Sequence, residues 1–153
     1  MILGLSVSVF FLFFLMVVPV SAAEPRTSTV WSVTGEDGVD VIPYVRADKK
    51  ALFVDFEGFT NEMGYVYYNL NYNQKASNVK GGVEGSFVPS GVPYTGHYNN
   101  VPYIRREILF GSCSKNVCIY HNPKNVTLTV NTQILEGKVA QYTKVLGIAD
   151  DQF

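Results

Sequence analysis

The sequence predicts an all-β protein, an antiparallel β-sandwich of about seven strands behind an N-terminal export signal. Apolar and polar residues alternate in several segments after residue 50, which is the period of a strand with one buried face. Gly, Pro, Asn or Ser separate these segments, as turns between short strands require. No capped segment has apolar residues at helical spacing, which excludes a parallel α/β fold with crossover helices. A closed barrel is the alternative, because periodicity does not distinguish one curled sheet from two stacked sheets.

The export signal is predicted for residues 1–23, which carry no charged side chain. The small residues Ser21, Ala22 and Ala23 precede Glu24, a pattern that signal peptidases cleave. We therefore expect a secreted or cell-surface domain. No Lys or Arg precedes the apolar run, and its length is sufficient to span a bilayer. An uncleaved helical anchor is the alternative, and it would be the only membrane attachment.

The remaining chain fits one domain. Removing residues 1–23 from the 153 leaves 130 residues, enough for a single core. We divide them into a leader with an edge strand, residues 24–49, and the sandwich, residues 50–153. The 12 basic and 13 acidic residues nearly balance, so nucleic acid is not an expected partner. We expect an extracellular protein or a glycan instead.

The leader contains two strand-like segments. Residues 27–33 alternate like an edge strand, and residues 35–38 interrupt the pattern. Residues 39–42 are compatible either with a short strand that stops at Pro43 or with a flexible tether. Trp31 is interpreted as a core residue rather than as an exposed platform for a ligand.

The sandwich begins with two alternating segments. In residues 51–57 the even-numbered side chains form an apolar face, whereas Asp55 and Glu57 fall on the other face, which we expect to be solvated. In residues 64–72 the even-numbered side chains again form the inner face.

Three further segments complete the predicted sheets. Residues 79–88 contain glycines, which allow a bulge or the close approach of a neighbour. Residues 126–134 alternate most regularly, and residues 138–148 supply the last strand.

The two cysteines are predicted to form a disulfide. Cys113 and Cys118 are the only cysteines, and exported proteins meet an oxidising environment. Four residues separate them, so they fit facing positions of a hairpin with arms at residues 103–113 and 118–121. Closing so short a ring contributes roughly 2 kcal/mol. The disulfide is therefore expected to fix one hairpin rather than the whole domain.

A candidate binding surface combines one strand and one loop. Residues 89–102 form the longest irregular segment, which is either a connection or a functional loop. This loop presents Tyr94, His97 and Tyr98 among Gly and Asn, a composition suited to adaptable contacts. Tyr65 and Tyr67 lie on the outward face of their strand. Sugars stack on such rings, so carbohydrate binding is one hypothesis, although alternating Tyr also arises from strand propensity.

Catalysis is not expected from these residues. Both cysteines are assigned to the disulfide, and only His97 and His121 remain as imidazole bases, without a Gly-x-Ser-x-Gly motif. A small hydrolase around His121 is the alternative.

No metal or other cofactor is expected. Cys113, Cys118 and His121 lack a fourth zinc ligand. Calcium is an open alternative at residues 36–40 or 150–151, whose acidic side chains do not follow a regular ligand spacing. Separately, Asn125 begins an Asn-Val-Thr sequence that would accept a glycan in a eukaryotic secretory route.

Residues 106–113, followed by Cys118-Ile-Tyr-His121 and the strand at 126–130, resemble short secreted proteins of uncharacterised bacteria. These pair a signal peptide with one Ig-like or fibronectin-type β-sandwich, and residues 67–72 are similar to a central strand of such sandwiches. The resemblance covers roughly residues 50–148 and implies an Ig-like fold and an extracellular location, but no activity. It departs from antibody domains because the two cysteines are too close in sequence for their inter-sheet bridge.

Overall fold

The computed structural model describes residues 33–77, 79–115, 117–134 and 140–153. The predicted signal, Trp31 and most of the strand expected at residues 27–33 lie outside these residues. The strands of the described part are β1 (Val33–Thr34), β2 (Asp40–Val45), β3 (Ala51–Glu57), β4 (Met63–Gln74), β5 (Lys80–Phe87), β6 (Gly96–Tyr98), β7 (Val101–Leu109), β8 (Gly111–Ser114), β9 (Val117–Tyr120), β10 (Pro123–Ile134) and β11 (Ala140–Ile148). Two short 3₁₀ turns, η1 (Pro89–Gly91) and η2 (Asp150–Gln152), are the helical elements of that part.

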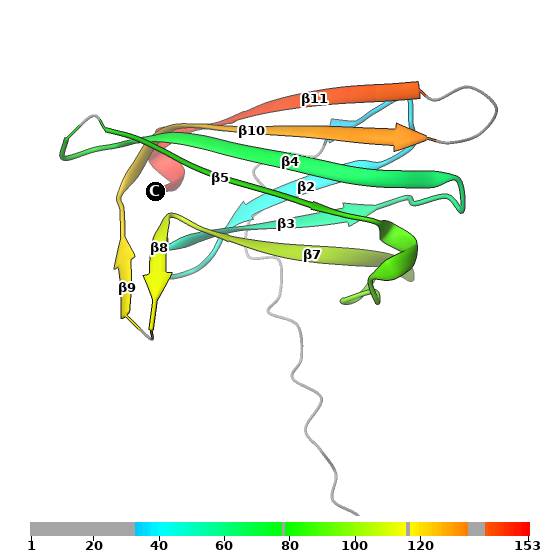
Figure 1. Ribbon diagram of the computed structural model, residues 1–153, viewed down its shortest axis with the longest axis horizontal. Helices are drawn as coiled ribbons and strands as arrows, with labels where there is room; N and C mark the ends of the chain where they lie inside the picture. Colours follow the sequence, from blue (N-terminus) through cyan, green and yellow to red (C-terminus); the bar gives the residue numbers. More distant parts are fainter. Residues whose placement is uncertain (1–32, 78, 116, 135–139) are drawn as a thin grey trace, which may run out of the picture.

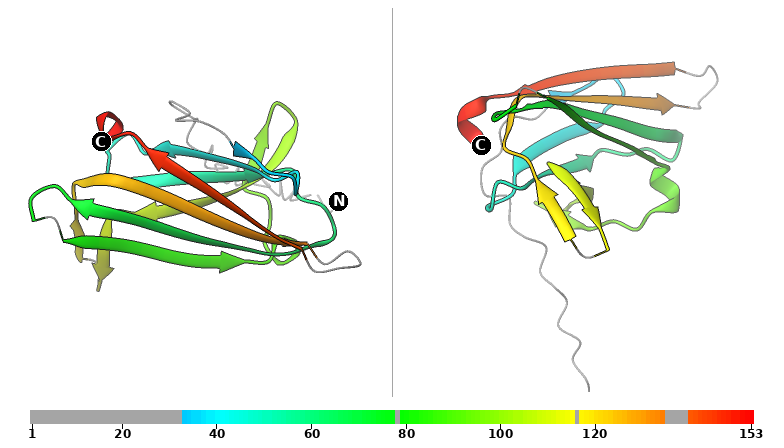
Figure 2. Two further views of the ribbon diagram at one scale, coloured as in Figure 1. Left: turned by 90° about the horizontal axis from the view of Figure 1, so that it is seen from above. Right: turned by 60° about the vertical axis from the view of Figure 1, so that its left-hand side comes forward.

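The strands form two antiparallel sheets that lie face to face (Figure 1). The five-stranded sheet has the order β1-β2-β3-β7-β6, and the four-stranded sheet has the order β11-β10-β4-β5. Hairpin β8–β9 belongs to neither sheet and projects away from both layers (Figure 2). The expected all-β architecture with antiparallel sheets is confirmed.

One core fills the space between the sheets. Leu52 and Phe56 of β3 pack in the same cluster as Leu70 of β4 and Leu128 of β10, and all four are fully buried. Burying such large apolar side chains is the main stabilising contribution to the fold. The predicted inner faces of residues 51–57, 64–72 and 126–134 are therefore confirmed.

The glycines of β5 permit close packing against β4. Gly81 lies opposite Tyr72, and Gly85 lies opposite Tyr68. A Cβ atom at Gly81 would lie 2.4 Å from Cζ of Tyr72, and one at Gly85 would lie 2.4 Å from the hydroxyl oxygen of Tyr68. The tyrosine rings thus occupy the space that side chains on β5 would need, which confirms the close approach expected there.

Strand β2 is an integral part of the five-stranded sheet. It pairs with β3 along its whole length, and its Val41 and Val45 belong to the core. Pro43 does not end the strand but lies opposite Val54 within it. The sheets therefore include residues that the sequence analysis assigned to the leader.

Asp55 and Glu57 are not solvated, contrary to the sequence-based expectation. They lie on the outward face of β3, yet their exposed fractions are 0% and 7%. Their neighbours on the same face, Tyr44 of β2 and Tyr103 of β7, are also buried. The five-stranded sheet is therefore buried on both faces at this position, so the assumption that one face meets water fails.

The segment between β5 and β7 is more regular than expected. It contains η1 and the edge strand β6, which turns back into β7 through Asn99 and Asn100. Both asparagines have positive φ, 49° and 66°, a conformation that two-residue hairpin turns require and Asn tolerates.

The predicted first arm of the disulfide hairpin is two strands rather than one. Strand β7 ends at Leu109, and β8 starts at Gly111 after a change of direction. A Cβ atom at Gly111 would lie 2.0 Å from the carbonyl oxygen of Ile119. Only glycine allows the backbone of the hairpin to approach this closely.

Candidate functional site

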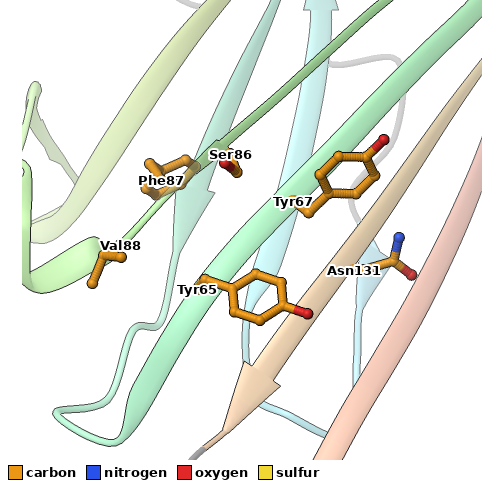
Figure 3. A pocket seen from close by; sticks show the side chains of 6 residues that line it. All are labelled: Tyr65, Tyr67, Ser86, Phe87, Val88 and Asn131. Atoms are coloured by element: carbon orange, nitrogen blue, oxygen red, sulfur yellow. The ribbon is translucent and has the colours of Figure 1, made fainter.

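A concave surface lies on the outward face of the four-stranded sheet. It encloses about 720 Å³ and is lined by Tyr65, Tyr67, Ser86, Phe87, Val88 and Asn131. Figure 3 shows Tyr65 and Tyr67 side by side on β4, with Asn131 on the neighbouring strand β10 and Ser86 on β5. Because successive side chains of a strand alternate between faces, the odd-numbered residues of β4 point outward here. We call this region the tyrosine surface.

Hydrogen bonds hold two side chains of the tyrosine surface in place. The Tyr67 hydroxyl donates to Oε2 of Glu84 on β5 at 2.7 Å. The Asn131 carbonyl oxygen accepts a hydrogen bond from the Thr143 hydroxyl at 2.6 Å, which leaves the Asn131 amide group as a donor facing the surface. Flat rings and neutral polar groups combine here, a set suited to a ligand with both apolar and hydroxyl faces.

The structure brings together only part of the predicted binding surface. Tyr65 and Tyr67 share the tyrosine surface, whereas Tyr94, His97 and Tyr98 do not line it. Tyr94 precedes β6, and His97 and Tyr98 lie on β6, at the edge of the five-stranded sheet. Tyr94 and Tyr98 are 51% and 48% exposed. The candidate residues therefore form two separate groups on different sheets.

Four residues that line the tyrosine surface were not predicted from the sequence: Ser86, Phe87, Val88 and Asn131. Ser86 and Asn131 both lie directly opposite Tyr67, one on each side of β4. The alternation of each strand indicated that these side chains point outward. Which strands are neighbours, and in which register, is not a property of any single segment.

His121 contacts a tyrosine side chain from the four-stranded sheet. Its Nδ1 lies 2.9 Å from the Tyr72 hydroxyl, and the two rings lie 6.0 Å apart. In the described part of the chain, the Tyr72 side chain hydrogen-bonds to His121. Burial raises the pKa of the Tyr72 hydroxyl. A protonated phenol beside an imidazole forms a structural contact between β4 and the segment that follows β9.

Two of the acidic residues considered for calcium, Asp37 and Asp150, hydrogen-bond to groups of the protein. Both carboxylate oxygens of Asp37 accept hydrogen bonds from Lys144, and Asp150 accepts one from the Asn125 backbone at 2.7 Å. Among the described residues, no three His, Cys, Asp or Glu side chains gather as a metal site. The expected disulfide between Cys113 and Cys118 is present, and the two residues face each other on β8 and β9.

A partly buried arginine, Arg105, lies on the outward face of the five-stranded sheet. Nε and Nη2 of Arg105 donate to the two carboxylate oxygens of Asp55 at 2.7 and 3.1 Å. The guanidinium carbon lies 5.1 to 5.2 Å from the ring centroids of Tyr44, Phe53 and Tyr103. Burial lowers the pKa of Arg105, but the hydrogen bond and the charge of Asp55 outweigh it and raise the pKa. The guanidinium stays charged, and it forms a packed structural cluster with Asp55 and the three rings.

Hairpin β8–β9 exposes apolar side chains. Val117 and Ile119 are 67% and 62% exposed, and the Lys50 ammonium lies 4.7 Å from the centroid of the Tyr120 ring. Exposed apolar residues that gather on a projecting element form a second surface suited to contact.

No protein-family model matches the chain, and neither the curated proteins nor the solved structures include a match to it. Within the described residues, no helix combines the length and the apolar composition that crossing a membrane requires. The architecture and the geometry of the sites therefore carry the functional argument.

Proposed function

We propose that the protein is a secreted or cell-surface, non-catalytic binding module that holds its ligand on the tyrosine surface. The observation that carries this proposal is that the neighbouring side chains of Tyr65 and Tyr67 both line a concavity of about 720 Å³. Strand β4 pairs with β10 at both Tyr65 and Tyr67, and with β5 at Tyr67, so the backbone that carries the rings is ordered before a ligand binds. The extracellular location rests on the apolar, uncharged residues 1–23.

We also propose that the sandwich is Ig-like and of the fibronectin type. Seven of the described strands have six or more residues: β2, β3, β4, β5, β7, β10 and β11. We number these seven strands from one to seven in chain order. The first, second and fifth (β2, β3 and β7) lie in one sheet. The other sheet has the order fourth, third, sixth and seventh (β5, β4, β10 and β11). In antibody constant domains the fourth strand lies beside the fifth. Here it lies beside the third, as in fibronectin-type domains. An experimental structure in which β5 pairs with β7 would contradict this assignment.

A carbohydrate is the ligand class that the tyrosine surface favours. Tyr rings present flat apolar faces to the C–H groups of a sugar, and the Asn131 amide and the Ser86 hydroxyl can hydrogen-bond sugar hydroxyls. The residues that line the surface are uncharged, which disfavours phosphorylated or strongly acidic ligands.

The test uses the exported protein on a broad glycan array, followed by calorimetry on the ligands that bind. Tyr65→Ala and Tyr67→Ala are expected to weaken binding about tenfold or more, because each removes one stacking ring. Tyr94→Ala is the control, since it removes an exposed tyrosine ring that lies outside the tyrosine surface. A silent array would reject carbohydrate as the ligand.

The broader proposal has its own test. A protein partner captured from the native cell surface should be lost with Tyr65→Ala and retained with Tyr94→Ala. Capture that is unaffected by Tyr65→Ala and Tyr67→Ala, together with a silent array, would reject the tyrosine surface as the binding site.

A further inference from the structure

Strand β5 forms a long and regular edge of the four-stranded sheet. It pairs with β4 from Lys80 to Phe87 without a register shift, and the topology of the described residues places no strand on its other side. In the described part of the chain, the five-stranded sheet instead ends in β1 and β6, of two and three residues. Short edge strands limit unwanted pairing, whereas a long edge without a bulge offers a template for another strand.

The hydrogen-bond pattern shows which groups of β5 point outward. The Gln74 N–H donates to the Val79 carbonyl at 2.9 Å, which continues the β4–β5 ladder by one pair. Hydrogen-bonded and non-hydrogen-bonded pairs alternate in an antiparallel ladder. The odd-numbered residues of β5 therefore bond to β4, and Lys80, Gly82, Glu84 and Ser86 direct their N–H and C=O groups to the open edge. These four residues are exposed.

We propose that two copies of this chain associate through their β5 edges, antiparallel, about a two-fold axis at Gly82. In this register Gly82 faces its own copy, and Lys80 of each copy faces Glu84 of the other. Each facing pair exchanges two backbone hydrogen bonds, and both opposite-charge pairs lie on the outward face. Gly82 has no side chain to obstruct the axis.

Charge complementarity selects this edge and this register. A register centred on Glu84 would place two carboxylates opposite each other, which is destabilising. The other edge of the same sheet, β11, carries the described outward side chains Thr143 and Val145, which are uncharged. Within the described residues of this sheet, β5 is thus the edge whose outward charges pair with themselves about a two-fold axis.

The association joins the two four-stranded sheets into one sheet of eight strands. Because the axis is perpendicular to the sheet, both tyrosine surfaces lie on the same side of it. Glu84 contacts the Tyr67 hydroxyl within each chain, so the interface lies next to the tyrosine surface. The association does not depend on the proposed function. If both hold, two ligand sites face the same extended target, which raises avidity without a new contact.

Sedimentation equilibrium of the exported protein over a wide concentration range tests the proposal. The wild type is expected to show a reversible monomer–dimer equilibrium. Lys80→Glu and Glu84→Lys each create two like-charge pairs and are expected to weaken the dimer about tenfold. The double variant K80E/E84K restores opposite charges and is expected to restore the affinity.

Two further variants keep the outcome decisive. Gly82→Pro removes an outward N–H without removing a bond to β4, and it is expected to give a monomer. Val145→Lys on β11 is the matched control and is expected to leave the dimer unchanged. Circular dichroism and thermal unfolding confirm that each variant is folded. A wild type that stays monomeric, a dimer that tolerates the single charge reversals, or a dimer that Val145→Lys abolishes would overturn the proposal.

Discussion

Lys144 donates hydrogen bonds to both carboxylate oxygens of Asp37, at 2.7 and 2.6 Å, although the two residues are 107 positions apart in the sequence. Asp37 lies in the turn between β1 and β2, and Lys144 lies on β11, so the pair connects the two sheets. Their side chains are 0% and 3% exposed. The Thr132 hydroxyl donates a further hydrogen bond to Asp37. A Cβ atom at Gly35 would lie 2.4 Å from Cε of Lys144, so the backbone of this turn covers the ammonium group.

Asp37→Asn is expected to destabilise the fold by about 3 kcal/mol, because it leaves the Lys144 ammonium buried without a counter-charge. Urea unfolding measures the loss. Glu36→Gln is the control, since it removes the same charge from an exposed position in the same turn and is expected to change stability by less than about 0.5 kcal/mol. Equal effects of the two variants would contradict the structural role of the pair.

The same carboxylate predicts a pH dependence. Burial raises the pKa of Asp37, but the hydrogen bond from Lys144, the hydrogen bond from Thr132 and the charge of Lys144 outweigh burial, so the pKa is lowered from 3.8. A lowered pKa contributes stability that is fully present above pH 3.8 and is lost as the pH falls through the folded-state value. Unfolding free energies measured down to pH 2 should therefore decrease more steeply for the wild type than for Asp37→Asn. Parallel curves would contradict this assignment.

Arg105→Lys is expected to cost about 2 kcal/mol. Lysine cannot donate the two parallel hydrogen bonds to Asp55 or stack its charge between flat rings as a guanidinium does. Arg46→Lys is the comparison, because Arg46 pairs with Asp48 at 2.6 Å where the carboxylate side chain is 44% exposed. Solvent screens that pair, and the expected loss in urea unfolding is below about 1 kcal/mol. The reverse ranking would show that the buried pair adds no specific stability.

Replacing Cys113 and Cys118 together by Ser is expected to loosen hairpin β8–β9 and to leave both sheets folded. The ring is short, so its loss costs at most roughly 2 kcal/mol, and the hairpin lies outside the core cluster. Hydrogen exchange should show faster exchange within residues 111–120 and unchanged protection in β3 and β10. Loss of protection in both sheets would contradict a local role.

Gly85→Val is expected to destabilise the fold by about 1 to 3 kcal/mol, because the new side chain overlaps the Tyr68 ring. Gly147→Val is the control, since a Cβ atom there meets no atom within 4 Å. Thermal unfolding compares the two. A Gly85→Val variant as stable as Gly147→Val would show that the ring is not confined by the glycine.

Local periodicity was sufficient to predict strands β3, β4 and β10 and the side chains that each directs into the core. The even-numbered residues of β4 and β10 are inward because each strand alternates independently of the others. The disulfide was also predictable, because Cys113 and Cys118 lie on one hairpin and face each other through local geometry alone. Features that depend on a single segment can therefore be predicted from the sequence.

Features that depend on two distant segments were not predictable. Asp37 and Lys144 contact each other only because the two sheets stack. The sequence around either residue does not indicate which residue is its partner. The burial of Asp55 had a signal that alternation overlooked, since Phe53 makes β3 an almost continuous apolar run. Such a run is typical of a strand buried on both faces. The tyrosine surface could be predicted only in part. Tyr65 and Tyr67 lie on the same strand, whereas Asn131 lies beside them only because β10 pairs with β4.

Hairpin β8–β9 lies outside the core cluster that the described strands of the two sheets form. None of its described side chains belongs to the core cluster, and its two arms are joined covalently at Cys113 and Cys118. Substitutions at Val117 and Ile119 can therefore diversify an exposed contact region while the architecture beneath stays the same. The hairpin offers a natural position for grafting foreign recognition peptides onto this scaffold.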